Sequence, residues 1–404
     1  MSSDAAGSRF AWALLAGSLV AAGFAAEARA QVAGGKPLTF TVSARASYDS
    51  NVAGGSDALA AMKHIRKDDL VYAPTATVSY VTPLGPQAVF LSGRASYEFH
   101  QYNKDLNVPS ASVQAGAPLR LGICSGGLNL GFDATATDAS RLPISVKKNV
   151  ETVTTGGLQF GCEVGAGLAA TVNVSRSYDK NSANTGIIDS TSTAYGAGLS
   201  YGNKRTGSVS LTGGFSRIDY AMNPLPGAIQ SPDVKSYFAS LAYSRQVGVK
   251  LRGNVGLTYS HTVQDGQALP AANTLGGNAS LSYHVNSKLD ATLSYSRQNE
   301  PTIQQGSRYT TSENLGLNAS YVLTPRLQLS AGGSYGRRRE HLAPGAVLVG
   351  SSSERSYSFS GGATLQVGSR GSLSLSASRS DKNSSIAEFD FKDYVVSIIA
   401  TTRF

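Results

Sequence analysis

The stretch LTFTVSARASY at residues 38–48 places apolar and polar side chains on alternate positions. One parity carries Phe40, Val42, Ala44, Ala46 and Tyr48, and the other carries Thr, Ser and Arg45. Because successive side chains of a β-strand point to opposite faces, such a strand has one apolar and one polar face. The pattern returns in AVFLSGRASYEF (88–99), LDATLSYSR (289–297) and SLSLSASR (372–379). The repeat predicts an all-β protein built from many similar amphipathic strands.

The composition favours one repetitive domain over several ordinary ones. The 404 residues include 44 Gly and 19 Tyr, and only 15% are charged. Such a chain is poor in the residues that build helices and rich in residues typical of sheets and turns.

The first thirty residues are predicted to be a cleaved secretory signal peptide. Arg9 precedes an apolar run at 10–26, and Ala28-Arg29-Ala30 forms an A-x-A cleavage site before Gln31. An uncleaved N-terminal membrane anchor is the alternative. With cleavage, residues 31–404 form a single exported domain.

Beyond the signal, no segment is apolar enough for a membrane helix. The longest strongly apolar run, VVSIIA at 395–400, has six residues, whereas a spanning helix needs about twenty. Only helices and closed barrels satisfy all backbone groups within lipid, so a barrel is the remaining membrane-spanning solution.

Short and long connections alternate along the chain. Tight turns such as TPLGPQ (82–87), NSK (286–288) and GSRG (368–371) alternate with long polar loops such as 53–68 and 340–354. Outer-membrane barrels have short periplasmic turns and longer extracellular loops. The alternation therefore predicts a transmembrane antiparallel β-barrel of about 18 strands, with 16 possible, and with both termini in the periplasm.

The last strand, FKDYVVSIIATTRF at 391–404, ends in Phe404 at the C-terminus. A terminal strand of this kind resembles the signal that the bacterial barrel-assembly machinery recognises, although Thr402 is more polar than usual for such strands. This resemblance implies an outer-membrane location and the assembly machinery as a partner.

An arginine recurs at one place in five strands that leave the periplasmic turns. Parity puts these residues on the lipid face at the extracellular end: Arg176, Arg217, Arg297, Arg337 and Arg379. Arginine binds phosphate oxygens bidentately, and a cation on the lipid face costs little near the interface. The five are predicted to form a collar that binds lipopolysaccharide phosphates. The alternative is that any polar residue can end a strand.

The two cysteines, Cys124 and Cys162, both fall beside predicted periplasmic turns. In that oxidising compartment a disulfide is expected, with two free thiols as the alternative. No histidine lies near either cysteine, so the spacing argues against a metal site. The net charge of +9 favours anionic lipids or anionic solutes, and nucleic acid is not an expected partner.

Candidate catalytic groups do not form a recognisable motif. The five histidines stand in unrelated contexts, and GGFSR and GLSYG are not nucleophile elbows. The expectation is a protein that is not an enzyme and that needs no cofactor or metal.

The strand positions predicted to face the lumen carry mostly hydroxyl side chains and few charged ones. The clearest inward charges are Arg45, Arg94, Glu98, Arg252 and Asp290. These are the candidate pore-lining residues of a water-filled channel for neutral or weakly anionic solutes. The first strand begins soon after the cleavage site, which argues against an N-terminal plug.

Two short motifs carry a family resemblance. YDSNV (48–52) closes the first strand, and DLVYAP (69–74) opens the second. They resemble the putative beta-barrel porin family (type 2), through Tyr48, Asp49, Asn51, Asp69 and Pro74. The resemblance implies an outer-membrane barrel of Gram-negative bacteria that serves polysaccharide export or surface attachment, with polysaccharide export components as partners. Asp49 and Asn51 are also suited to capping the strand end, with Asn51 in a left-handed turn.

Three functions remain open from the sequence. The first is a channel associated with export or surface handling of exopolysaccharide. The second is a general diffusion porin for small hydrophilic solutes, which should carry an inward-folded constriction loop and facing ladders of acidic and basic residues. The third is a non-transporting structural or adhesive barrel.

Overall fold

A computed structural model describes residues 38–85, 87–137, 148–182, 188–203, 205–221, 233–265, 271–301, 307–342 and 353–404. The signal peptide expected at 1–30 lies outside the described residues. In the described part of the chain, no helix is long and apolar enough to cross a membrane.

Eighteen antiparallel strands form one sheet that closes on itself, because β1 pairs with both β2 and β18. The strands are β1 Leu38–Asp49, β2 Asp69–Leu84, β3 Gln87–His100, β4 Val108–Leu121, β5 Cys124–Ala136, β6 Val150–Gly165, β7 Leu168–Lys180, β8 Ser190–Asn203, β9 Gly207–Tyr220, β10 Val234–Val247, β11 Leu251–Gln264, β12 Ala272–His284, β13 Leu289–Pro301, β14 Ser307–Thr324, β15 Leu327–Leu342, β16 Ser353–Val367, β17 Gly371–Ser384 and β18 Phe391–Arg403. The predicted fold class and strand number are confirmed.

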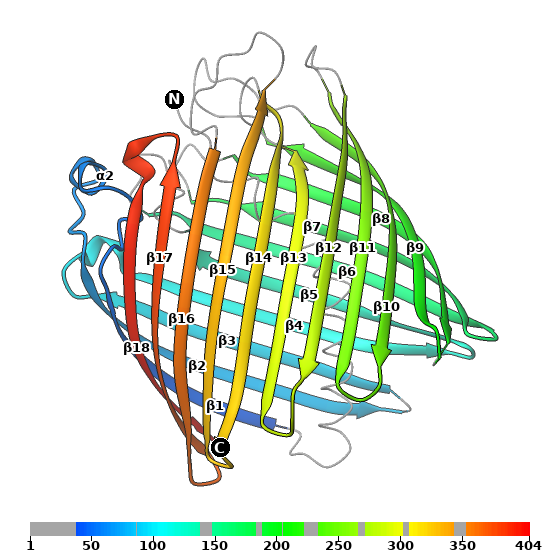
Figure 1. Ribbon diagram of the computed structural model, residues 1–404, viewed down its shortest axis with the longest axis horizontal. Helices are drawn as coiled ribbons and strands as arrows, with labels where there is room; N and C mark the ends of the chain where they lie inside the picture. The colour runs from blue at the N-terminus through cyan, green and yellow to red at the C-terminus, as the bar shows by residue number, and fades with distance from the viewer. Residues whose placement is uncertain are drawn as a thin grey trace.

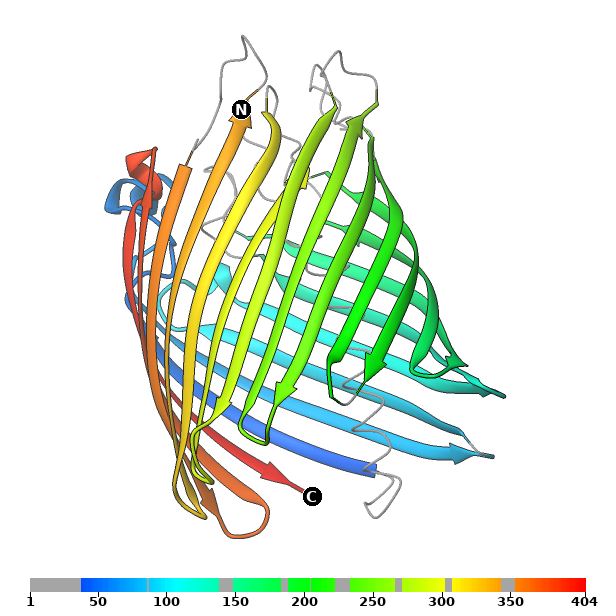
Figure 2. The ribbon, with the colours of Figure 1, turned by 45° about the vertical axis from the view of Figure 1, so that its right-hand side comes forward.

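Every predicted tight turn joins two neighbouring strands at one end of the barrel, here called the turn end. Glycines with positive φ mark several of these turns, including Gly85, Gly122 and Gly368. The longer connections lie at the opposite end, the loop end. In Figure 1 the front strands run steeply and the back strands run nearly across the view, so the wall is strongly tilted. Figure 2 shows the same closed wall after rotation.

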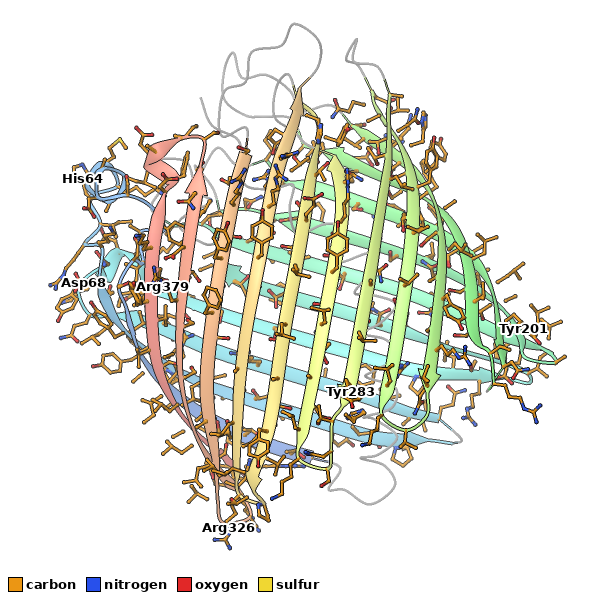
Figure 3. The ribbon with its side chains drawn as sticks, in the orientation of Figure 1. His64, Asp68, Tyr201, Tyr283, Arg326 and Arg379 are labelled. Carbon is orange, nitrogen blue, oxygen red and sulfur yellow. A yellow bond between two sulfur atoms is a disulfide. The ribbon has the colours of Figure 1, made fainter. Side chains whose placement is uncertain are left out.

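The apolar parity of the strands forms the outer face. Large apolar side chains at the middle of this face are half exposed, for example Leu257 at 57% and Leu275 at 61%. Exposed aromatic side chains form two girdles. Near the turn end these include Phe40, Tyr80, Tyr201, Tyr243 and Tyr283, and near the loop end Tyr48, Tyr195, Tyr295 and Tyr357. Figure 3 shows Tyr201 and Tyr283 at the turn end. Two aromatic belts around an apolar band are typical of membrane barrels.

The C-terminal strand completes the barrel at the β1–β18 seam. The backbone N–H of Phe404 donates to the carbonyl of Phe40 over 2.8 Å. The two rings lie 5.9 Å apart between centroids. The residue predicted as an assembly signal therefore lies beside the seam that closes the sheet.

A short helix, α2 Asp57–Met62, lies in the connection expected to be an irregular loop. Ser56 caps it, because its hydroxyl oxygen accepts a hydrogen bond from the Leu59 N–H. The helix contacts η3 Ala387–Phe389 in the β17–β18 connection. A small apolar core of Ala53, Ala60, Ile65 and Leu106 forms beneath it. In Figures 1 and 2, α2 lies at the outer edge of the loop end.

Candidate functional site

The inner face of β1–β3 carries an ion pair between two predicted pore-lining residues. Arg45 Nη2 donates to Glu98 Oε1 over 2.6 Å, and both side chains remain about one third exposed, at 39% and 34%. Ala73 lies opposite Arg45 on β2, between the two charged strands, and is 6% exposed. Its small side chain leaves room for Arg45 to reach Glu98. The charges of Arg45 and Glu98 therefore compensate each other on the inner face of β1–β3.

Arg94 belongs to a second row of the inner face. It lies opposite Ser112 on β4, and Ser112 lies opposite Asp133 on β5. Arg94 has no ion-pair partner among the described residues. Asp133 was not predicted as a pore-lining residue, although its parity in GFDATA points inward. The row places one positive and one negative group two strands apart on one wall.

The remaining predicted pore-lining residues lie elsewhere. Arg252 and Asp290 stand at the turn end of β11 and β13, and His284 Nδ1 forms a hydrogen bond with the Asp290 carboxylate. The sequence grouped five charged residues, and the structure brings only Arg45, Arg94 and Glu98 into one sector. Parity gives the face of a residue but not its position around the barrel.

The inner face of β10–β18 is lined by hydroxyl groups between its two rims. Many are paired across neighbouring strands: Ser260 with Thr274 at 2.6 Å, Ser376 with Ser397 at 2.8 Å, Ser240 with Thr258 at 3.0 Å, and Thr364 with Ser374 at 3.0 Å. A hydroxyl has one donor and two acceptor lone pairs, so each pair retains capacity for water or solute. Apart from the apolar side chains of Phe238, Val395 and Ile399, this surface is polar and uncharged.

Two inner ion pairs at the loop end were missed in the sequence. Arg338 lies 2.9 Å from Glu340, and Lys382 lies 3.0 Å from Glu354. Arg338 falls in the arginine run 337–339, directly after Arg337, which the sequence placed at a strand end. Because β15 extends to Leu342, parity assigns Arg338 and Glu340 to the inner face. A sequence reading that extends this strand to residue 342 would have predicted that Arg338 and Glu340 face the lumen.

The family motif residues hold the loop-end rim together. Asp69 is 0% exposed, and its carboxylate accepts hydrogen bonds from the backbone N–H groups of Tyr102 and Asn103 at 3.0 and 3.1 Å. The Asn103 side-chain amide donates to it over 2.9 Å, and His100 Nδ1 lies 3.2 Å away. Asp69 therefore ties the start of β2 to the β3–β4 connection.

Asn51 joins the first connection to the last one. Its amide nitrogen donates to the carbonyls of Gly55 at 3.0 Å and Lys392 at 3.3 Å, while Asp49 accepts from the Asn51 N–H at 2.7 Å. The expectation of a left-handed Asn51 is wrong, because the positive φ in this turn belongs to Gly54, at 63°. The chain turns at Gly54, where the absence of Cβ removes the steric cost.

The other two motif residues belong to the wall. Tyr48 is 43% exposed in the loop-end girdle, and Pro74 lies opposite Ala44 on the outer parity. Together with the buried contacts of Asp69 and Asn51, this arrangement gives the motif a structural role in the rim.

Cys124 and Cys162 face each other on the paired strands β5 and β6 and form a disulfide. The bond joins positions 38 residues apart at the turn end, on the outer parity. Among the described residues, no group of His, Cys, Asp and Glu is arranged to bind a metal.

The five arginines of the predicted collar differ in whether they have acidic partners. All five arginines share the outer parity, but Arg217 is paired with Asp219 and Asp233, Arg297 with Glu313, and Arg379 with Asp381. Arg379 also lies 5.2 Å from the Tyr394 ring centroid. Arg176 and Arg337 have no ion-pair partner in the part of the chain that the structure describes. The collar is therefore a set of local clusters.

Part of the chain matches a known protein family. Residues 233–404 match the family described as Putative beta-barrel porin 2. No curated protein sequence matches the chain.

Solved structures share the fold at low sequence identity. Pseudomonas aeruginosa OpdK with vanillate has a TM-score of 0.52 and 13% identity, and covers 91% of this chain and 99% of its own. Pseudomonas aeruginosa OccK2 in complex with glucuronate has a TM-score of 0.53 and 11% identity, with 91% and 98% covered. Pseudomonas aeruginosa OccK9 has a TM-score of 0.51 and 12% identity, again with 91% and 98% covered.

The description of the matched family is that of a porin. The family match and the closed 18-stranded barrel confirm the predicted outer-membrane location. The protein is thus an 18-stranded outer-membrane β-barrel whose residues 233–404 match the family described as Putative beta-barrel porin 2.

Proposed function

We propose that the barrel is a passive, water-filled channel for small hydrophilic solutes. The observation that carries the proposal is the closed 18-stranded wall with a hydroxyl-lined inner face. Barrels of 16–18 strands enclose an aqueous lumen rather than a packed core. Paired hydroxyls keep that lumen wet without binding any solute strongly.

The charges of the lumen support weak ion selectivity. Arg45 and Glu98 compensate each other within one ion pair. Arg94 and Asp133 carry opposite charges in one row. Neither sign dominates, so neutral solutes should pass as readily as small ions of similar size.

The first long connection supports an open mouth. Residues 50–68 pack against the rim through α2 and η3 instead of extending across the barrel. A porin with a constriction should carry an inward-folded loop and ladders of acidic and basic residues that face each other across the lumen. Here Arg94 and Asp133 lie on the same wall, with Ser112 of β4 between them. The proposed channel is therefore wide and weakly selective.

Planar-bilayer recording of the refolded mature protein tests this function. We expect steady ohmic currents in KCl and a reversal potential near zero in a salt gradient. Vanillate and glucuronate, which occur in the solved structures of similar fold, serve as anionic probes. A folded barrel that conducts no current would contradict the proposal.

Export or surface handling of polysaccharide is the second candidate, and the hydroxyl-lined wall is the observation that favours it. Hydroxyls suit saccharides because they both donate and accept hydrogen bonds. The same recordings separate the two candidates. Block by long oligosaccharides at concentrations where mono- and disaccharides have no effect would favour polysaccharide handling over general diffusion.

A further inference from the structure

The outer face of β13–β16 brings arginines together just beyond the loop-end girdle. Arg297 lies opposite Glu313, Glu313 opposite Arg337, and Arg337 opposite Arg355. Neighbouring strands lie about 4.8 Å apart, so Arg337 and Arg355 are direct neighbours on one face. Like charges in this relation repel each other. Arg339 lies one outward position further along β15.

This arginine patch, defined as Arg297, Arg337, Arg339 and Arg355, has too few acidic neighbours. Glu313 lies 3.6 Å from Arg297. Arg337, Arg339 and Arg355 have no ion pair with any described residue. The nearby carboxylates of Glu340 and Glu354 belong to the inner parity and pair with Arg338 and Lys382. Four guanidinium groups thus face one carboxylate.

The adjoining connections do not supply the missing acids. The sequence of 302–306 is TIQQG, and that of 343–352 is APGAVLVGSS. Neither contains Asp or Glu, so this surface keeps its positive charge unless an external anion binds there.

A second row of outward cations gives an internal comparison. Arg176, Arg217 and Lys235 share a row on β7–β10. There, Arg217 pairs with Asp219 and Asp233, and Lys235 lies 2.7 Å from Asp265. In that row Arg217 and Lys235 are compensated by the protein itself, whereas Arg337 and Arg355 of the arginine patch are not.

Aromatic side chains border the patch on its membrane side. Tyr335 and Tyr357 each lie one outward position closer to the membrane centre than Arg337 and Arg355, and their ring centroids are 5.2 Å apart. Phe359 follows on β16 and is 61% exposed. The arginines therefore lie at the level of lipid headgroups, and the aromatic side chains lie nearer the membrane centre, at the level of the acyl chains. This arrangement is complementary to a lipid that carries a phosphate on its headgroup.

We propose that the arginine patch binds the phosphate group of a phosphorylated lipid in the outer leaflet, whose acyl chains pack on Tyr357 and Phe359. Arg337 and Arg355 bind the phosphate oxygens by charge-assisted hydrogen bonds. This anion removes the repulsion between the two guanidinium groups. The proposal limits lipid phosphate binding, predicted for five arginines around the barrel, to the patch on β13–β16. It does not depend on whether the channel conducts.

The test measures binding of hexa-acylated lipid A carrying two phosphates to the folded protein in detergent, by native mass spectrometry. Arg337→Gln/Arg355→Gln should weaken binding by at least about tenfold, since two charge-assisted contacts are lost. The matched control, Arg217→Gln/Lys235→Gln at the two compensated cations of the second row, should change binding by less than about twofold. Heat-dependent gel mobility verifies that each variant is folded.

Two further arms identify the ligand. Dephosphorylated lipid A should bind the wild type as weakly as the double Gln variant binds lipid A. Inorganic phosphate at millimolar concentration should not displace lipid A, because it lacks the acyl contacts. Equal losses in both double variants, unchanged binding in Arg337→Gln/Arg355→Gln, or full displacement by inorganic phosphate would each overturn the lipid site. Arg337→Lys/Arg355→Lys should bind at an intermediate level, since lysine keeps the charge but not the bidentate geometry.

Discussion

The two halves of the barrel wall, β1–β9 and β10–β18, have the same number of strands but different inner faces. Between its rims, the first half carries Arg45 and Arg94 among its lumen-facing residues. Between its rims, the described inner face of the second half carries hydroxyl, amide and small side chains together with the apolar Phe238, Val395 and Ile399, and no charged ones. The first half also contains the disulfide and the Asp69 network.

The family match begins at residue 233, directly before β10. It therefore covers the half whose inner face is uncharged between its rims, and omits the half that carries Arg45, Arg94 and the disulfide. We infer that the second half supplies a general polar wall, whereas the first half determines ion preference and reinforces the barrel. Each of the following changes tests this division.

The largest effect is expected for the disulfide. Replacing both Cys124 and Cys162 by Ser removes a cross-link that closes a loop of 38 residues. In the chain-entropy account such a loss costs about 2–4 kcal/mol of unfolding free energy. Urea midpoints of the refolded barrel in lipid vesicles measure this difference. Equal midpoints for the two proteins would show that strand pairing alone holds this part of the first half.

Asp69→Ala should have a slightly smaller and more local effect. It leaves the buried N–H groups of Tyr102 and Asn103 without their acceptor, at a cost of about 1–3 kcal/mol. Hydrogen exchange should increase in 50–68 and 101–107 and stay unchanged in β10–β18. Asp265→Ala, at an exposed ion pair of the second half, is the control. Uniform exchange across the whole barrel in Asp69→Ala would show that the rim network is not local.

Arg94→Glu should change ion selectivity without changing stability. The substitution reverses one charge in the row with Asp133, so the cation-to-anion permeability ratio should rise about two- to fivefold. Arg252→Glu, at the turn end of the second half, should shift the ratio less. Reversal potentials in a KCl gradient measure both variants. A larger shift from Arg252→Glu would place the selective region in the second half.

Ser376→Ala should have the smallest effect. It removes one hydroxyl of the Ser376–Ser397 pair, while many similar groups remain on the same wall. Single-channel conductance should stay within about 10% of the wild-type value, since the hydroxyl carries no net charge. A strong fall in conductance would identify a specific solute site where the account expects a general surface.

Much of the fold follows from alternation and turn chemistry. Apolar residues on every second position predict the strands and their faces, and Gly-containing turns such as 368–371 set the connections. The segments 106–122 and 149–164 show weak alternation, yet β4 and β6 are complete strands. Each is held by hydrogen bonds to both neighbours, which sequence alternation does not record.

Several site features depend on contacts across the sheet. The helix α2 is six residues long and is stabilised by Ser56 and by packing against η3, so its own pattern is too short to predict it. The neighbouring positions of Arg337 and Arg355 depend on strand register. Parity predicts that both face lipid, and only the pairing of β15 with β16 brings them together.

Osmotic swelling of liposomes that contain the folded barrel, produced as residues 31–404, tests the central claim most directly. A passive channel should admit neutral sugars at rates that fall steadily with sugar size, and Arg94→Glu should leave those rates unchanged. Liposomes that contain folded barrel but do not swell in any sugar would contradict a water-filled channel.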